Sequence, residues 1–313
     1  MAKWTKKSYD EAKMEEKVLM PHTYLLPLRI YGFVSSKLPK AFNYWLNIPN
    51  DKLNALQQIF VKINNALAIQ DDLMDESLYR RTRPAAHRVF GKALAFNSCI
   101  HLQFIALQDI IQLGHPKGAE VYCKNYINFA RGQGLSTYWR DHQHDVTVDE
   151  YTQTTINQTG CIILMIVQMM QLFSENKTDY EYLAKIFSIY YQIRDEYVDL
   201  KKPEAVEEGT RIPELQKLST MTFCDDFTEG KYTLPVIYAL KSSQHRDIIL
   251  GILKMRTRDL KTKEYLLSLL EETGGIEKTR ETLREIEADI LAEIRRLGGN
   301  PVFEDLMRDL HSW

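Results

Sequence analysis

The chain has 313 residues, of which 44% are hydrophobic and 26% are charged, as in an ordinary globular protein. Its 40 basic and 42 acidic side chains leave a net charge of -2, so no positive field is present to attract nucleic acid. This composition argues against a nucleic-acid-binding protein and favours one large domain or two small ones.

Apolar residues recur every three or four positions along most of the chain, which predicts helices. The clearest case is 53–69, where Leu56, Phe60, Ile63 and Leu67 trace one helix face. Similar periodicity predicts helices at about 85–113, 117–138, 147–174, 178–200, 266–270, 276–297 and 303–310. Sustained alternation and Asn-Gly hairpin signals are missing from the sequence, so we expect no sheet.

The segment from Lys201 to Thr220 is charged and contains two prolines and a glycine, which predicts an exposed loop. No linker or repeat divides the chain, so we predict a single all-α domain over residues 1–313. The longest apolar run, 161–173, is shorter than the roughly 20 residues that cross a bilayer, and we expect no stable membrane insertion. The charged start and the scattered cysteines predict a cytoplasmic protein.

The first motif with chemical content lies at the end of the helix predicted at 53–69. Asp71 and Asp75 are four residues apart, so they share a helix face, and Asp72 lies beside them. Two carboxylates held this close repel each other unless a cation lies between them, and Mg²⁺ prefers such oxygen ligands. A solvated acidic helix face explains the motif equally well. Three arginines that suit a bound diphosphate follow closely: Arg80, Arg81 and Arg83.

A second acidic motif ends the helix predicted at 178–200. Asp195 and Asp199 repeat the four-residue spacing, and Gln192 lies one turn earlier. Two acidic clusters that each end an apolar helix can face each other across a cavity in a helical bundle. Farther on, Lys231 follows an acidic run and has the charge to close over a phosphate, although a charged surface turn explains that segment equally well.

These motifs together resemble the trans-isoprenyl diphosphate synthases, most closely the geranylgeranyl diphosphate synthases of animals and fungi. The resemblance extends over nearly the whole chain from about Tyr24, whereas residues 1–20 match poorly. Its strongest matches are the strings that begin at Ala41 (AFNYWL), Asp71 (DDLMDES), Ala86 (AHRVFG), Gly132 (GQGL), Tyr138 (YWRD), Gln192 (QIRD), Phe223 (FCDDFTEGKYTLP) and Gly298 (GGNP).

The resemblance implies a single-domain, class I isoprenoid synthase bundle around a central apolar pocket, assembled as a homodimer or higher oligomer. It implies an allylic prenyl diphosphate substrate and three Mg²⁺ ions, with Mn²⁺ as an alternative, held by Asp71, Asp72, Asp75, Asp195 and Asp199. The residues implied in catalysis are Asp71, Asp75, Arg80, Asp195 and Lys231. Those implied or proposed in substrate binding are Arg80, Arg81, Gln192, Lys231, Tyr190, Tyr191, Leu67 and Ala66.

The departures from the family pattern concern charged groups. Where the family binds isopentenyl diphosphate through a lysine, an arginine and a histidine, this chain has Gly32, Ser35 and Asn64. Each charge-assisted contact contributes about 1.5–3 kcal/mol, so we expect condensation with that substrate to be badly impaired. On the allylic side, four further family positions also differ: Ser136, Gln158, Glu196 and Met221.

Three hypotheses follow from this pattern. The first is a terpene synthase that ionises the allylic diphosphate and lets the carbocation react internally or with water. In it, Tyr190, Tyr191 and Phe187 are candidates for stabilising the cation through their rings. The second is a geranylgeranyl diphosphate synthase with altered contacts to isopentenyl diphosphate. The third is a catalytically silent regulatory subunit. Leu67 and Ala66 at the implied pocket floor are not aromatic, so a chain of fifteen or twenty carbons can enter. The likeness to the geranylgeranyl diphosphate synthases favours geranylgeranyl diphosphate, with farnesyl diphosphate as the alternative.

Overall fold

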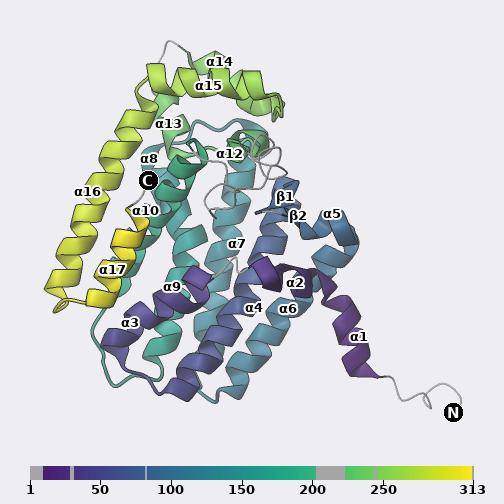
Figure 1. The fold of residues 1–313 in the computed structure, drawn as a ribbon, viewed down its shortest axis with the longest axis vertical. Coiled ribbons are helices and arrows are strands. Elements are labelled where there is room, and N and C mark those ends of the chain that lie inside the picture. Colours follow the sequence, from purple (N-terminus) through teal and green to yellow (C-terminus); the bar gives the residue numbers. More distant parts are fainter. Residues whose placement is uncertain (1–9, 29–31, 82, 202–222, 243–244, 312–313) are drawn as a thin grey trace, which may run out of the picture.

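The computed structural model describes residues 10–28, 32–81, 83–201, 223–242 and 245–311, and these residues are helical almost throughout (Figure 1). The predicted all-α fold is thus confirmed. The helices of the first half are α1 (Glu11–Val18), α2 (Met20–Leu25), α3 (Leu38–Leu46), α4 (Asn50–Asp75), α5 (Ala86–Phe90), α6 (Lys92–Gln112) and α7 (Gly118–His142). Those of the second half are α8 (Val148–Thr155), α9 (Cys161–Gln171), α10 (Glu181–Asp199), α12 (Asp225–Glu229), α13 (Leu234–Leu240), α14 (Arg246–Met255), α15 (Leu260–Glu272), α16 (Gly275–Arg296) and α17 (Pro301–Leu310).

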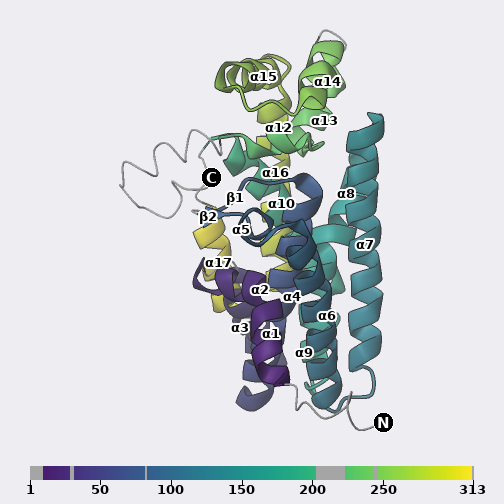
Figure 2. The same cartoon turned by 90° about the vertical axis from the view of Figure 1, so that its right-hand side faces the viewer.

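The long helices α4, α6, α7, α9 and α10 run roughly along the long axis of the molecule (Figures 1 and 2). α4 packs against α6, α7 against α9, and α10 against α16, which joins all of them around one apolar core. The core is continuous because each helix turns its periodic apolar residues inward; on α4 these include Leu56, Phe60 and Ile63, all buried. The polar ends of α4 and α10 therefore both adjoin this apolar core.

Two predicted helices are each divided in the structure. The stretch predicted at 85–113 becomes α5 and α6, separated at Gly91, whose φ of 81° favours glycine. The stretch at 147–174 becomes α8, the π-helix η3 (Ile156–Gly160) and α9. The helices α13 and α14 were not predicted, because seven and ten residues carry too little periodicity for a clear signal.

The expectation that no sheet exists was wrong in one small respect. A hairpin of two antiparallel strands, β1 (Tyr79–Arg80) and β2 (Arg83–Pro84), follows α4. Strands of two residues are too short to leave an alternating pattern in the sequence. Apart from Lys201, the predicted loop at 201–220 lies outside the described residues.

A second π-helix, η2 (Phe33–Lys37), leads directly into α3. Pro39 lies in the first turn of α3 and has no N–H to donate, so a regular helix through this point would lose a hydrogen bond and meet a steric clash at the preceding turn. The wider π-turn accommodates the proline without ending the helix. The helix is thus remodelled directly before Pro39.

The start of α17 yields a stability prediction. The fully buried Asn300 caps this helix, because its Oδ1 accepts from the Phe303 N–H at 2.9 Å while its Nδ2 donates to the Ala41 carbonyl at 2.9 Å. We expect Asn300→Ala to lower the free energy of unfolding by about 2–4 kcal/mol, because it removes a helix cap and leaves buried polar groups unpaired. Chemical denaturation monitored by circular dichroism measures this loss.

The matched control is Asp259, which caps α15 at an exposed position through the Thr262 N–H at 2.9 Å. Asp259→Ala removes a cap without desolvated partners and should cost only about 1 kcal/mol. Equal losses for the two variants would show that the tertiary bond from Asn300 to α3 contributes nothing.

Candidate active site

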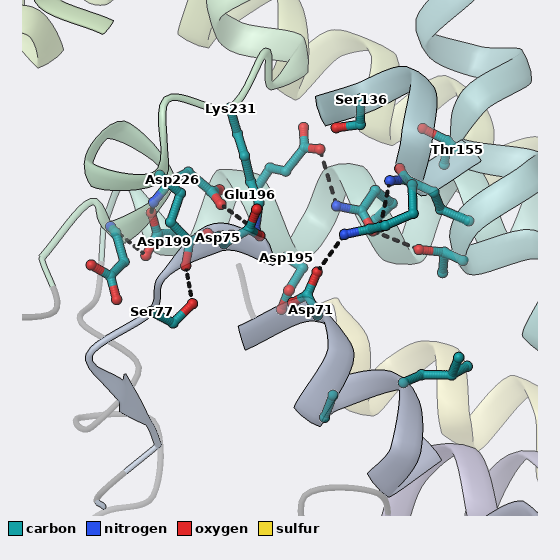
Figure 3. Close-up of a pocket in the computed structure, with 18 of the residues that line it drawn as sticks. Asp71, Asp75, Ser77, Ser136, Thr155, Asp195, Glu196, Asp199, Asp226 and Lys231 are labelled. Carbon is teal, nitrogen blue, oxygen red and sulfur yellow. Dashed lines mark hydrogen bonds and ion pairs between the residues drawn. The ribbon is translucent and has the colours of Figure 1, made fainter. Parts of the chain in front are cut away.

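A cavity of about 350 Å³ lies between α4, α7, α8, η3, α10 and the segment around α12 (Figure 3). Helix α4 contributes one face to it, with a lining residue every three or four positions: Asn64, Leu67, Ala68, Asp71 and Asp75. This spacing follows the helical repeat, so the face runs continuously from apolar residues to carboxylates. The cavity therefore has a charged end and an apolar end.

Both predicted acidic clusters line this cavity. Asp71 and Asp75 lie on the last turns of α4, and Asp195 and Asp199 lie on the last turns of α10. Figure 3 shows the four side chains around one space. The C-terminal end of a helix is already the negative end of its dipole, so carboxylates there are unfavourable unless positive charge is supplied. The structure thus brings together the groups that the sequence suggested would meet.

The hairpin after α4 folds Arg80 back onto the first cluster. The Arg80 Nε donates to Asp72 at 2.9 Å, and its Nη2 lies 3.1 Å from an Asp71 carboxylate oxygen. Burial alone would raise the pKa of Asp71, but the positive charges of Lys231 and Arg80 lower it below its usual value. Asp72 itself is fully buried and does not line the cavity, so the structure does not bring it to the predicted metal position.

Asp75 is held by two cations from distant parts of the chain. Lys231 Nζ lies 3.0 Å from one Asp75 carboxylate oxygen and 2.5 Å from Glu229, while Arg140 Nη1 of α7 lies 3.0 Å from the other oxygen. Burial lowers the pKa of Lys231, but the surrounding carboxylates outweigh it and raise that pKa well above its usual value. Arg140 was missed as a candidate, although it lies inside the Tyr138-Trp-Arg-Asp string that supported the resemblance.

Further carboxylates around α12 complete the charged end. Asp225, Asp226 and Glu229 line the cavity, and the backbone N–H groups of Asp225 and Asp226 each lie 3.4 Å from the Asp199 carboxylate. Sequence reasoning noted this acidic run but treated it only as the neighbourhood of Lys231. The available signal was a pair of acids followed three residues later by another, which places them on one side of a short helix.

Negative charge at this end exceeds positive charge. The lining includes two cationic side chains, Arg80 and Lys231, among the described residues. It includes eight carboxylic acids: Asp71, Asp75, Asp195, Glu196, Asp199, Asp225, Asp226 and Glu229. Burial raises the pKa of Asp75, Asp225 and Asp226 to about 7 and that of Glu196 to about 8, with neighbouring carboxylates adding to the effect. The cationic side chains of the lining are therefore too few to neutralise all of these carboxylates.

Glu196 links neighbouring helices at the second acidic cluster. Its carboxylate accepts hydrogen bonds from the Tyr151 hydroxyl at 2.9 Å, the Leu234 N–H at 2.9 Å and the Gln192 side chain at 3.1 Å. The longer glutamate side chain thus joins α10 to α8 and to the start of α13. The departure from the family's paired aspartates gives this position a bridging role between helices.

The apolar end differs from the one expected. Among the predicted floor residues, Leu67 lines the cavity but Ala66 does not, and Ala68 takes its place. The aromatic lining comes from α7, α8 and the segments next to the charged end: Tyr79, Phe129, Trp139, Tyr151 and Tyr232. These aromatics were not predicted, because helical spacing alone does not show which face of α7 or α8 meets α4.

The predicted aromatic candidates on α10 lie elsewhere. Tyr190 is fully buried and does not line the cavity, since it is two positions before Gln192 and so on the opposite side of the helix. Tyr191 stacks on Phe33 of η2 with ring centroids 4.8 Å apart, and Phe187 is buried beside them. The structure therefore brings none of these rings to the cavity. Arg81, at a φ of 53°, is likewise not a lining residue.

Uncharged side chains occupy several positions where the family has cations. Gln158 Nε2 donates to Gln133 at 2.8 Å, and Gln133 in turn donates to Asp71 at 3.0 Å, so a neutral relay reaches the first cluster. Ser35 is buried on η2, and Asn64 lines the cavity. Met221 lies outside the described residues.

Comparison with known proteins agrees with this geometry. The model of the polyprenyl synthetase family matches residues 36–270. A terpene synthase from Matsumurasca onukii is 38% identical over 301 residues, covering 96% of this chain and 95% of that protein. Geranylgeranyl pyrophosphate synthases from Mucor circinelloides f. lusitanicus and Dictyostelium discoideum are 34% and 30% identical, covering 94% and 97% of this chain and 93% and 96% of theirs. The chain therefore belongs to the polyprenyl synthetase family of trans-isoprenyl diphosphate synthases and is an enzyme that processes prenyl diphosphates.

Proposed function

We propose that this enzyme is a terpene synthase, which ionises an allylic prenyl diphosphate and converts the carbocation to a terpene without isopentenyl diphosphate. One observation carries the proposal: the allylic carboxylates and cations lie around one cavity, whereas the positions implied to hold the second diphosphate are Gly32, Ser35 and Asn64. A diphosphate without cationic partners binds weakly in a buried site, because its desolvation is not compensated.

Packing around η2 supports the same conclusion. The Phe33 ring, next to Gly32 in sequence, stacks on Tyr191 with centroids 4.8 Å apart, and its centroid lies 6.1 Å from that of Phe187. Ser35 is buried in the same π-helix. A diphosphate at this position would therefore lie beside an aromatic cluster and a neutral serine, an environment that does not compensate its charge.

The charged end fits Mg²⁺, with Mn²⁺ as the alternative. Its donors are carboxylate oxygens, the ligands that such cations prefer. Asp71 and Asp75 on α4 would hold metal opposite Asp195 and Asp199 on α10. Among the residues described, no three such side chains are close enough to enclose an ion alone, so diphosphate oxygens would complete the coordination of the three ions implied by the family. When bound, the metal neutralises the charge of the departing diphosphate.

The remaining lining residues suit ionisation in a dry pocket. Arg80 and Lys231 are positioned at the charged end to donate hydrogen bonds to diphosphate oxygens. Phe129, Trp139 and Ile162 form an apolar wall that excludes bulk water from the hydrocarbon chain. Leu67 at the lining is not an aromatic plug, so it admits a long hydrocarbon chain. We favour geranylgeranyl diphosphate as the substrate because of the likeness to geranylgeranyl pyrophosphate synthases, with farnesyl diphosphate as the alternative.

A geranylgeranyl diphosphate synthase is the second candidate function. It is favoured by the names of the relatives from Mucor circinelloides f. lusitanicus and Dictyostelium discoideum, and Arg81, which the family uses for isopentenyl diphosphate, is present. The third hypothesis, a silent regulatory subunit, has less support, because both acidic clusters and their cations are assembled around a cavity.

Product analysis tests the proposal. Purified enzyme with Mg²⁺ and geranylgeranyl or farnesyl diphosphate alone should release diphosphate and form a terpene detectable by gas chromatography. We expect Asp71→Asn to lower the rate at least about 100-fold, comparable to losing a group that stabilises transition-state charge. The control is Glu76→Gln, because Glu76 follows the same helix but pairs with Lys92 outside the cavity lining. It should leave the rate within about twofold of wild type.

A longer prenyl diphosphate formed only when isopentenyl diphosphate is added would instead establish the synthase. Absence of turnover with every allylic substrate, in a protein that is folded by circular dichroism, would contradict both enzymatic candidates.

The raised pKa values predict a pH-dependent stability of the metal-free enzyme. Unfolded carboxyl groups titrate near pH 4, whereas Asp75, Asp225 and Asp226 hold their protons up to about pH 7 in the fold. Their contribution to stability is therefore fully present below about pH 4, decreases as the pH rises, and is lost above about pH 7. In EDTA, we expect the melting temperature to fall by roughly 4 °C between pH 6 and pH 8.5.

Mg²⁺ added with inorganic pyrophosphate should restore the melting temperature, and by more at pH 8.5 than at pH 6, because ionised carboxylates bind cations. Asp226→Asn removes one of these acids and should flatten the pH profile. A melting temperature that rises over this range in EDTA would contradict the charge analysis.

The surface of α6 supports the proposed homodimer. Its buried side faces α4 and α5, whereas four exposed apolar residues recur at helical spacing along it: Phe96, Ile100, Phe104 and Ile111. α6 is also the one helix in the described part of the chain that is long and apolar enough to cross a membrane. A second copy of this chain covers such residues by packing helix against helix, and further exposed apolar residues on α7 extend the surface.

Phe104, 66% exposed, provides the test. We expect Phe104→Glu to convert a dimer to monomer in multi-angle light scattering, because it places a charge inside an apolar interface. Tyr265→Glu on α15, an exposed aromatic far along the chain, is the control and should remain dimeric. A monomeric wild type, or one that binds neutral lipid vesicles through α6, would overturn the dimer.

A further inference from the structure

Two polar atoms in the cavity lining have no hydrogen-bond partner. The Nδ2 of Asn64 and the Oγ1 of Thr154 are each buried without one, and both residues are only 3% exposed. Leaving a buried amide or hydroxyl unpaired costs about 1–3 kcal/mol, so polar groups at such positions call for a partner that the cavity can hold. Thr154 lies on α8 between Tyr151, which bonds Glu196, and Gln158, which is linked through Gln133 to Asp71, so it belongs to the charged end. Asn64 is the unpaired group that lies elsewhere in the cavity.

Asn64 lies well away from the charged end. It precedes Asp71 by seven residues on the same face of α4, which places it about 10 Å farther along the helix. Between them on that face are Leu67 and Ala68, which bring apolar surface to the cavity. A diphosphate held by the carboxylates and their cations therefore does not reach Asn64, whereas the hydrocarbon chain attached to it passes alongside.

The unpaired amide of Asn64, beside the path of the hydrocarbon chain, can bind a water molecule. Water donates and accepts hydrogen bonds, and it binds buried polar groups that otherwise lack a partner. The carboxamide of Asn64 can orient a water oxygen through its Nδ2, which is the group without a partner. Because this side chain is not charged, the water stays neutral and keeps a lone pair available.

We propose that Asn64 positions a water molecule that captures the carbocation, so that the principal product is a terpene alcohol; this rests on the proposed terpene synthase function. The allylic carbon–oxygen bond breaks and its electron pair leaves with the diphosphate. The water oxygen then forms a bond to a cationic carbon of the chain, and its proton passes to the released diphosphate. The sum is an allylic diphosphate plus water giving an alcohol plus diphosphate, with no change in oxidation state.

Isotope labelling tests this directly. In water enriched in ¹⁸O, the wild type should give an alcohol that carries one ¹⁸O atom, identified by mass spectrometry. Asn64→Leu replaces the amide with an apolar side chain of similar size. We expect it to lower the fraction of alcohol among all products at least tenfold, in favour of hydrocarbon, when products are normalised to released diphosphate.

The adjacent Asn65 is a matched control. It lies on the same helix and is equally buried, but its side chain pairs with His22 at 2.9 Å and does not line the cavity. Asn65→Leu should therefore leave the alcohol fraction at the wild-type value even if it lowers stability. A reduced alcohol fraction in this variant would show that general disturbance of α4, rather than the loss of a water site, changes the product.

The outcomes separate this inference from the function on which it rests. Diphosphate release with only hydrocarbon products from the wild type overturns the water site but leaves the terpene synthase standing. An unchanged alcohol fraction in Asn64→Leu does the same. Failure of the wild type to release diphosphate from any allylic substrate overturns both.

Discussion

Repulsion among carboxylates is the interaction on which this structure depends. Asp75 ends α4 and Asp199 ends α10, so the acidic clusters lie where both helix dipoles are already negative. Burial strengthens the repulsion, since charges interact more strongly out of water. Three surrounding elements supply positive charge to the carboxylates: the hairpin contributes Arg80, the segment after α12 contributes Lys231, and α7 contributes Arg140. A site with this much unbalanced charge is organised for cationic and anionic ligands together.

The fold was largely predictable from the sequence, because long amphipathic helices carry a strong periodic signal. The helix at 53–69 corresponds to α4, and the stretch at 178–200 corresponds to α10, with errors confined to the ends. The breaks at Gly91 and at η3 were not visible, since apolar periodicity continues across a π-turn or a single glycine. The short helices α13 and α14 were missed because packing rather than local pattern sustains them.

The site was predictable where it depends on helix geometry and unpredictable where it depends on tertiary contact. Asp71 and Asp75 share a helix face because of their spacing alone. The cavity that they share with Asp195 was predictable because both apolar helices end in an acidic cluster. Orientation within a helix bundle was the missing information. It determines that Tyr190 faces the core, that Phe129 faces the cavity and that Asp72 turns toward Arg80. A single sequence does not specify which neighbour each face meets.

The ammonium group of Lys231 has a consequence for the order in which ligands load. In the protein alone it rests against Asp75 and Glu229, so it already serves as an internal counter-ion. A divalent ion that binds alone must displace the Lys231 ammonium from these carboxylates. When a phosphorylated ligand binds with the ion, the ammonium can pair with the phosphate instead. Thermodynamic linkage then makes each ligand strengthen the affinity for the other, and partly loaded forms stay scarce. Under the proposed function, such a pocket stays unloaded in a cell that contains free Mg²⁺ until the prenyl diphosphate binds with it.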